Sequence, residues 1–256
     1  MGLASLAALP IAVNAAAYAF AARARRRQGA VCPGDEGTPW SSRAHGFVAE
    51  CVAAWLLLTV PMTSWRRASD ARPTRPVMVL YTRGASAGRL GRRLRRAGVH
   101  PHPVRCSRLL GGIETNATDL AHAIGRVRAA GGASRVDVVA HGLGGLVARA
   151  YLRRPGTVGT VARVVTLGTP HEGPVAREWA GFDDSDPLPA RVDFVSIYSA
   201  ADAFVVPPAR GYHPDAFNVE VRGVGHLSLL VSFRVFDLVR ENLLADDHVT
   251  PARSHA

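Results

Sequence analysis

The chain has no lysine, and all 31 of its basic residues are arginine. Together with 20 acidic residues, they give a formal net charge of +11. This positive charge would favour contact with an anionic membrane surface. Paired Cys/His fingers and aromatic RNP runs are missing too, so nothing beside the charge indicates nucleic-acid binding. We therefore expect no nucleic-acid partner and attribute the arginine to a composition bias, which also shows in the frequent Ala, Val and Gly.

Cysteine is scarce, with only Cys32, Cys51 and Cys106. They form no CxxC pair and no metal-ligand spacing, and their number neither requires nor excludes an oxidising compartment. We expect neither a metal ion nor a cofactor. Charged residues make up 20% of the chain and apolar residues 48%, which excludes a wholly disordered chain and allows one α/β domain with a substantial core.

The front of the chain differs from the rest. Residues 1–22 carry no charge and are mostly Ala, Leu, Ile, Val and aromatic, and about 20 apolar residues let a helix cross a bilayer. Positive charges follow this run, at Arg23 and 25–27, whereas a cleaved signal peptide carries them before it. This order predicts an uncleaved membrane anchor over residues 1–30 with a cytoplasmic Arg cluster; an amphipathic or disordered leader is the alternative.

A second apolar stretch, Phe47–Met62, is interrupted by a single charge, Glu50. Its uncharged part is short for a full membrane span. It is either a second membrane helix, which would decide the side of the membrane that the rest of the chain faces, or a helix lying on the following domain. We assign residues 31–75 to a loop, this helix and a linker, residues 76–245 to the main domain, and residues 246–256 to a tail.

From residue 76 onward, short apolar runs alternate with stretches of helical composition. Such runs are typical of strands buried on both faces. We expect strands at Val77–Tyr81, Val136–Ala140, Val161–Leu167, Val192–Tyr198 and Phe217–Val221, and helices near 86–97, 116–130, 143–154 and 227–244. The segment Val99–Val104, broken by two prolines, is at best an edge strand. The fold class is α/β, a mostly parallel sheet with helices on both faces, preceded by an N-terminal apolar helical region.

The strand Val136–Ala140 runs directly into His141-Gly142-Leu143-Gly144-Gly145 and then a helix. This is the strand–turn–helix context of the G-x-S-x-G nucleophile elbow, where small residues let strand and helix pack closely. A reacting hydroxyl would project from the apex of the turn. Here the apex is Gly142, which has no side chain.

At this turn the chain resembles the α/β-hydrolase superfamily, and within it the small bacterial lipase/esterase group, whose members usually carry HSxGG. The resemblance runs from about Pro76 to Leu244 and includes Val165–Pro174, which resembles the GTPHxG motif of these lipases. It implies an α/β-hydrolase fold with Asp202, in IYSAADAFVVPP, as the acid and His226, in GVGHLSLL, as the base, in the family's chain order.

Against that family the chain departs at two places. Gly142 replaces the nucleophilic Ser, so no side chain there can attack an ester. Tyr81-Thr82 stands where relatives place His-Gly, and β-branched Thr resists the positive φ that Gly accepts. The resemblance places the weakened oxyanion hole at Leu143, Thr82 and Arg83.

Two substitutes for the missing hydroxyl follow from the sequence. The side chains of Ser86, Thr169 or His171 could approach the space beside Gly142. Alternatively, His226, oriented by Asp202, could act as a general base on a water molecule.

These features predict a membrane-tethered, lipase- or esterase-like pseudo-hydrolase with impaired catalysis that still takes an ester or lipid-like ligand. One alternative is an active hydrolase of carboxylic or lipid esters that uses water or a relocated nucleophile with His226 and Asp202. The other is a non-catalytic binding or scaffold partner. We expect the protein in the inner membrane of a bacterium, with its side of the membrane, its ligand and its oligomeric state left open.

Overall fold

The computed structural model describes residues 75–81, 84–106, 112–157, 159–172 and 187–245, together with helical residues at 15, 16, 19, 47, 48, 50, 51 and 53. Most of the expected anchor (1–30), Thr82, Arg83 and the expected tail (246–256) lie outside the described residues. Within the described part of the chain, no helix is long and apolar enough to cross a membrane.

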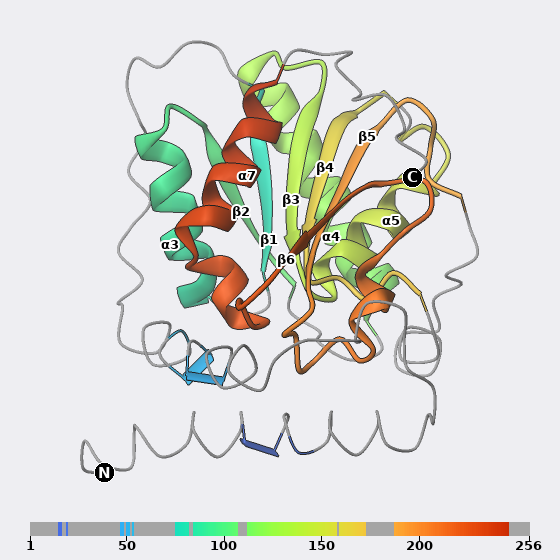
Figure 1. Cartoon of the computed structure of the whole chain (residues 1–256). Helices are drawn as coiled ribbons and strands as arrows, with labels where there is room; N and C mark the ends of the chain where they lie inside the picture. The colour runs from blue at the N-terminus through green and yellow to red at the C-terminus, as the bar shows by residue number, and fades with distance from the viewer. Residues whose placement is uncertain are drawn as a thin grey trace.

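Six strands form one sheet in the order β2-β1-β3-β4-β5-β6 (Figure 1). They are β1 (Val77–Tyr81), β2 (Pro101–Arg105), β3 (Val136–His141), β4 (Val161–Leu167), β5 (Asp193–Ser199) and β6 (Phe217–Val221). Every neighbouring pair is parallel, which confirms the α/β class. The bounds of β1, β4 and β6 are those predicted from their apolar runs.

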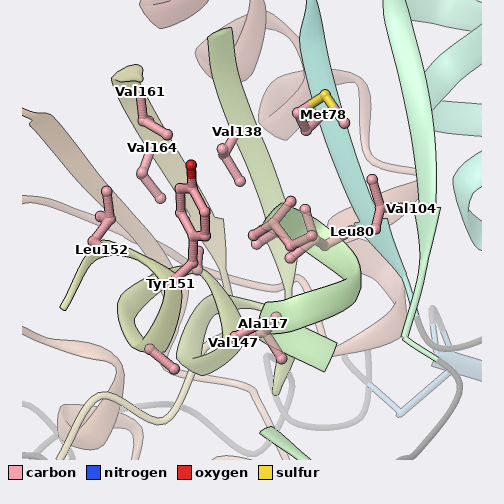
Figure 2. Packing of buried hydrophobic residues seen from close by; sticks show 14 of the residues in the cluster. Met78, Leu80, Val104, Ala117, Val138, Val147, Tyr151, Leu152, Val161 and Val164 are labelled. Atoms are coloured by element: carbon pink, nitrogen blue, oxygen red, sulfur yellow. The ribbon is translucent and has the colours of Figure 1, made fainter. Parts of the chain in front are cut away.

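Helices cover both faces of this sheet because its side chains alternate between them. Met78 and Leu80 of β1 pack into one cluster with α4 (Ile113–Gly131) and α5 (Gly144–Leu152). Val77 and Val79 pack into a second cluster with α3 (Gly84–Arg96) and α7 (Phe233–Leu244). Figure 2 shows the first cluster, in which Tyr151 of α5 points toward the strands.

The start of α4 differs from the expected one. We expected a helix near 116–130, but α4 begins at Ile113 and its N-cap residue is Gly112, without a side-chain cap. Thr118 donates its hydroxyl to the carbonyl of Glu114 within the helix, at 3.0 Å. The helix ends at Gly131, one residue beyond the expected end, and Gly132 adopts the left-handed conformation that closes a helix, with φ of 65°.

The prediction of a single closing helix over 227–244 is also wrong. A 3-10 turn, η2 (Leu227–Leu230), comes first, and α7 starts separately at Phe233. Ser232 separates them with an extended backbone, and its hydroxyl accepts the N–H of Val235 as an N-cap.

Strand β2 lies at the edge of the sheet, as its two prolines predicted. The N–H of Val77 donates to the carbonyl of His100, at 2.9 Å. Backbone groups point alternately to the two sides of a strand, so the nitrogens of Pro101 and Pro103 point away from β1. Their missing N–H groups therefore cost the sheet no hydrogen bond.

Two helical glycines give opposite predictions for stability. A Cβ atom on Gly145 of α5 would lie 2.2 Å from the Thr169 Oγ1, whereas one on Gly125 of α4 would meet nothing within 4 Å. We expect Gly145→Ala to lower the free energy of unfolding by about 1–3 kcal/mol through overpacking. The matched Gly125→Ala should raise it by roughly 0.5–1 kcal/mol through helix propensity. Denaturant unfolding checks both, and equal effects would contradict the packing described here.

Candidate functional site

The loops at the carboxyl ends of β3, β4, β5 and β6 meet at one place, because parallel strands all end at the same edge of the sheet. The turn after β3 is tight. Gly142 has φ of +56° and donates its N–H to Leu167 at 2.9 Å, and α5 begins two residues later. Gly144 lies against β1, since a Cβ on it would be 3.3 Å from the Leu80 Cβ. Small residues are thus required where strand and helix cross.

The side-chain direction of Gly142 points at His226. A Cβ on Gly142 would lie 3.2 Å from the His226 Nε2 and 3.6 Å from its Cε1. The structure therefore brings together two of the residues predicted from the sequence. Leu143, the next residue, is the N-cap of α5 and adopts helical dihedrals.

His226 is paired with Asp202 from the loop after β5. The His226 Nδ1 lies 2.7 Å from the Asp202 Oδ2, and the side chains are 13% and 1% exposed. The other carboxylate oxygen, Oδ1, accepts the N–H groups of Phe204 and Val205 at 2.8 and 2.9 Å. With both oxygens engaged, Asp202 holds the imidazole in one orientation, with Nε2 toward Gly142.

Gly168, directly after β4, leaves room for this pair. Its φ is +56°, and a Cβ on it would lie 3.0 Å from the Asp202 Oδ2 and 3.1 Å from the His226 Nδ1. It would also come within 2.8 Å of Leu229. The glycine of the GTPH segment is therefore needed both for its backbone conformation and for the space that the Asp–His hydrogen bond occupies.

The charge of Asp202 controls the protonation of His226. Burial lowers the pKa of His226, but the charge and hydrogen bond of Asp202 raise it, assisted by the charge of Glu50, so the net pKa lies above the ordinary 6.5. Its neighbour His141 donates from Nε2 to the His226 carbonyl at 3.0 Å. Burial, together with the charge of His226, lowers the pKa of His141 to about 3, so His141 is neutral.

Two of the three suggested substitutes for the missing hydroxyl hold the scaffold together. Thr169 donates its hydroxyl to the carbonyl of Gly142 at 2.8 Å. His171 is fully buried and its Nε2 lies 3.0 Å from the hydroxyl of Thr166. The side chain of Ser86 lies outside the described residues. No group of three or more His, Cys, Asp or Glu in the described ranges is arranged to hold a metal ion.

Sequence reasoning missed one residue of the site, Glu50. It is 0% exposed, and its carboxylate accepts the N–H groups of Leu227 and Ser228, which follow His226, at 2.9 and 2.8 Å. The sequence did contain an indication, because Glu50 is the single charged residue in the apolar stretch Phe47–Met62. Its partner lies 177 residues further along the chain, so no local pattern identifies the contact.

The raised pKa of His226 gives a testable pH dependence. Asp202→Asn should lower the pKa of His226, measured by NMR titration of the imidazole, because the larger of the effects that oppose burial is then removed. A raised folded pKa means that the pair stabilises the fold fully below the pKa of an unfolded histidine and loses this effect as the pH rises through the folded value. The stability difference between wild type and Asp202→Asn should therefore shrink toward alkaline pH. An unchanged His226 titration in the folded variant would contradict this pairing.

The fold has counterparts among known proteins. A family model described as a PGAP1-like alpha/beta domain matches residues 117–183. Lipase B of Aspergillus fumigatus is similar with a TM-score of 0.54 at 18% identity; the alignment covers 68% of this chain and 53% of that one. The mature lipase BlEst2 of Bacillus licheniformis aligns with a TM-score of 0.55 at 17% identity, covering 68% and 96%. A bromoperoxidase of Bacillus anthracis gives 0.51 at 14% identity, covering 69% and 94%.

The chain thus spans about half the length of the fungal lipase and nearly all of the mature bacterial one. These likenesses agree with the six-stranded parallel sheet and its flanking helices. The chain has the α/β-hydrolase fold, with lipases among its structural neighbours.

Proposed function

We propose that this lipase/esterase-like α/β-hydrolase is a pseudo-hydrolase, in which Gly142 occupies the position of the nucleophile. The observation that carries the proposal is the direction of the missing side chain, which points at the His226 Nε2 from 3.2 Å. A serine hydroxyl on that Cβ would be within reach of a base already paired with Asp202. The residues that move protons are thus kept, while the group that would attack is absent.

The size of the loss follows from the chemistry. An acyl-enzyme forms only when a nucleophilic side chain attacks the carbonyl carbon, and glycine has none. Removing the nucleophile of a serine protease costs on the order of a millionfold in rate. The proposed oxyanion hole at Leu143, Thr82 and Arg83 is weakened as well, because Thr82 resists the backbone geometry that glycine would provide. Turnover through a covalent intermediate should be negligible.

Binding does not require the hydroxyl. Phe204 lies beside His226, with ring centroids 5.1 Å apart, and is 44% exposed. An apolar ring next to the imidazole suits an ester or lipid-like ligand, which we propose as the partner. A membrane tether formed by residues 1–30, on the bacterial inner membrane, is part of the same proposal and would bring such a ligand close. A role as a non-catalytic scaffold partner follows if no ligand binds.

Restoring the hydroxyl tests the proposal. Wild type should not react with a fluorophosphonate probe, whereas Gly142→Ser should become labelled and gain modest ester hydrolysis. Gly142→Ala is the matched control, because it carries the same Cβ and the same cost of a positive φ, of order 1–3 kcal/mol, without the hydroxyl. Labelling should disappear in Gly142→Ser combined with His226→Ala. Labelling of wild type, or silence of a folded Gly142→Ser, contradicts the proposal.

A second candidate function is hydrolysis by water without an acyl-enzyme. It is favoured by the engaged Asp202–His226 pair and by the 13% exposure of the His226 side chain, which lets solvent reach the ring. Wild type would then hydrolyse short p-nitrophenyl esters slowly, and His226→Ala would abolish the turnover. Turnover that survives His226→Ala excludes this mechanism.

A further inference from the structure

The carboxylate of Glu50 contacts the loop that carries His226. It is 0% exposed and comes from a helical segment upstream of the main domain. Burying a carboxylate is costly unless hydrogen bonds compensate. Here the Oε2 accepts the N–H of Leu227 and the Oε1 accepts the N–H of Ser228. These are the first N–H groups of η2, which have no acceptor within the turn itself.

The loop is shaped to receive this carboxylate. A Cβ on Gly225 would lie 2.3 Å from the Glu50 Cγ and 2.4 Å from its Oε1. Any side chain at position 225 would therefore displace Glu50. Glycine at this position, one residue before His226, gives the carboxylate its space.

The upstream segment presents one face to the domain. Ala53, three residues after Glu50, is also 0% exposed, whereas Val48 is 60% exposed. Residues three apart share a face of a helix. The burial pattern is that of a helix lying on the domain through this face, one of the two alternatives for the segment.

Glu50 also acts on His226 electrostatically. Its charge contributes to raising the pKa of His226, after the larger effects of burial and of Asp202. In the other direction, burial raises the pKa of Glu50 above its ordinary value, with a smaller contribution from the charge of Asp202, although its two backbone hydrogen bonds and the charge of His226 partly oppose this. The two groups are therefore coupled, although no hydrogen bond joins their side chains among the contacts described.

We propose that Glu50 is a positioning residue, which fixes the loop of His226 by bonding the two amides that follow it, so that the upstream segment completes the site of the main domain. Asp202 fixes the ring of His226 through Nδ1, and Glu50 fixes the backbone of the two residues that follow it. The inference depends on the proposed function only in naming His226 as the base.

The test uses the full chain and needs no catalysis. In Glu50→Ala, hydrogen exchange of the Leu227 and Ser228 amides should quicken about tenfold or more, because both donors, of which that of Ser228 is buried, lose their acceptor. The His226 pKa, followed by NMR, should fall at the same time. Glu50→Gln keeps the shape but not the charge, and should lower the pKa with a smaller change in exchange. Val48→Ala, on the exposed side of the same segment, is the matched control and should change neither.

A second variant guards against simple unfolding. Gly225→Ala leaves Glu50 in the chain but takes its space, and should reproduce the faster exchange of both amides. Unchanged exchange and an unchanged His226 pKa in Glu50→Ala would overturn the inference. In a Gly142→Ser background, Glu50→Gln should slow fluorophosphonate labelling severalfold. If Gly142→Ser itself stays unlabelled while the exchange and pKa change as expected, the proposed function fails and the positioning role stands.

Discussion

The hydrogen bond between Asp202 and His226 is the contact on which the arrangement of the site depends. Its two residues come from the loops after β5 and β6, and a parallel sheet is what brings those loops together at one edge. Backbone N–H groups on the acid, and a neutral His141 at the carbonyl of the base, leave the pair little freedom. Such a buried, fully engaged pair is expensive to keep. This pair lies beside Gly142, which has no side chain for the histidine to activate.

Space for the pair is created by side chains that are absent. Gly168 makes room for the hydrogen bond itself, and Gly225 makes room for the carboxylate behind the histidine loop. Gly142 differs from these two, because a Cβ there would meet only the imidazole of His226, 3.2 Å from its Nε2, which is tighter than an ordinary contact. The first two glycines are required by packing. At the third, a small side chain would require the imidazole to shift slightly and would carry the cost of a positive φ.

Much of the fold could be predicted from the sequence. The strands at 77–81, 161–167 and 217–221 were placed at their observed bounds. The first of them is a continuous apolar run, which has few other ways to be buried. The order of Gly142, Asp202 and His226 along the chain indicated their meeting at one edge. The start of α4 was missed because Gly112 caps it without a side chain, and the break at Ser232 because the apolar period continues across it. Glu50 could not be placed, since its partners are distant in sequence and its surroundings are apolar.

The prolines of β2 affect how the sheet can associate with strands of other molecules. The two edges of a sheet are where a foreign strand would attach, and attachment needs N–H donors along the edge. On the β2 side, Pro101 and Pro103 lack the N–H groups that would point outward from the edge. A strand from another molecule, folded or unfolding, therefore cannot form a continuous set of hydrogen bonds with β2. Strand-to-strand association, whether in a functional assembly or in aggregation, is thereby directed to the opposite edge, β6.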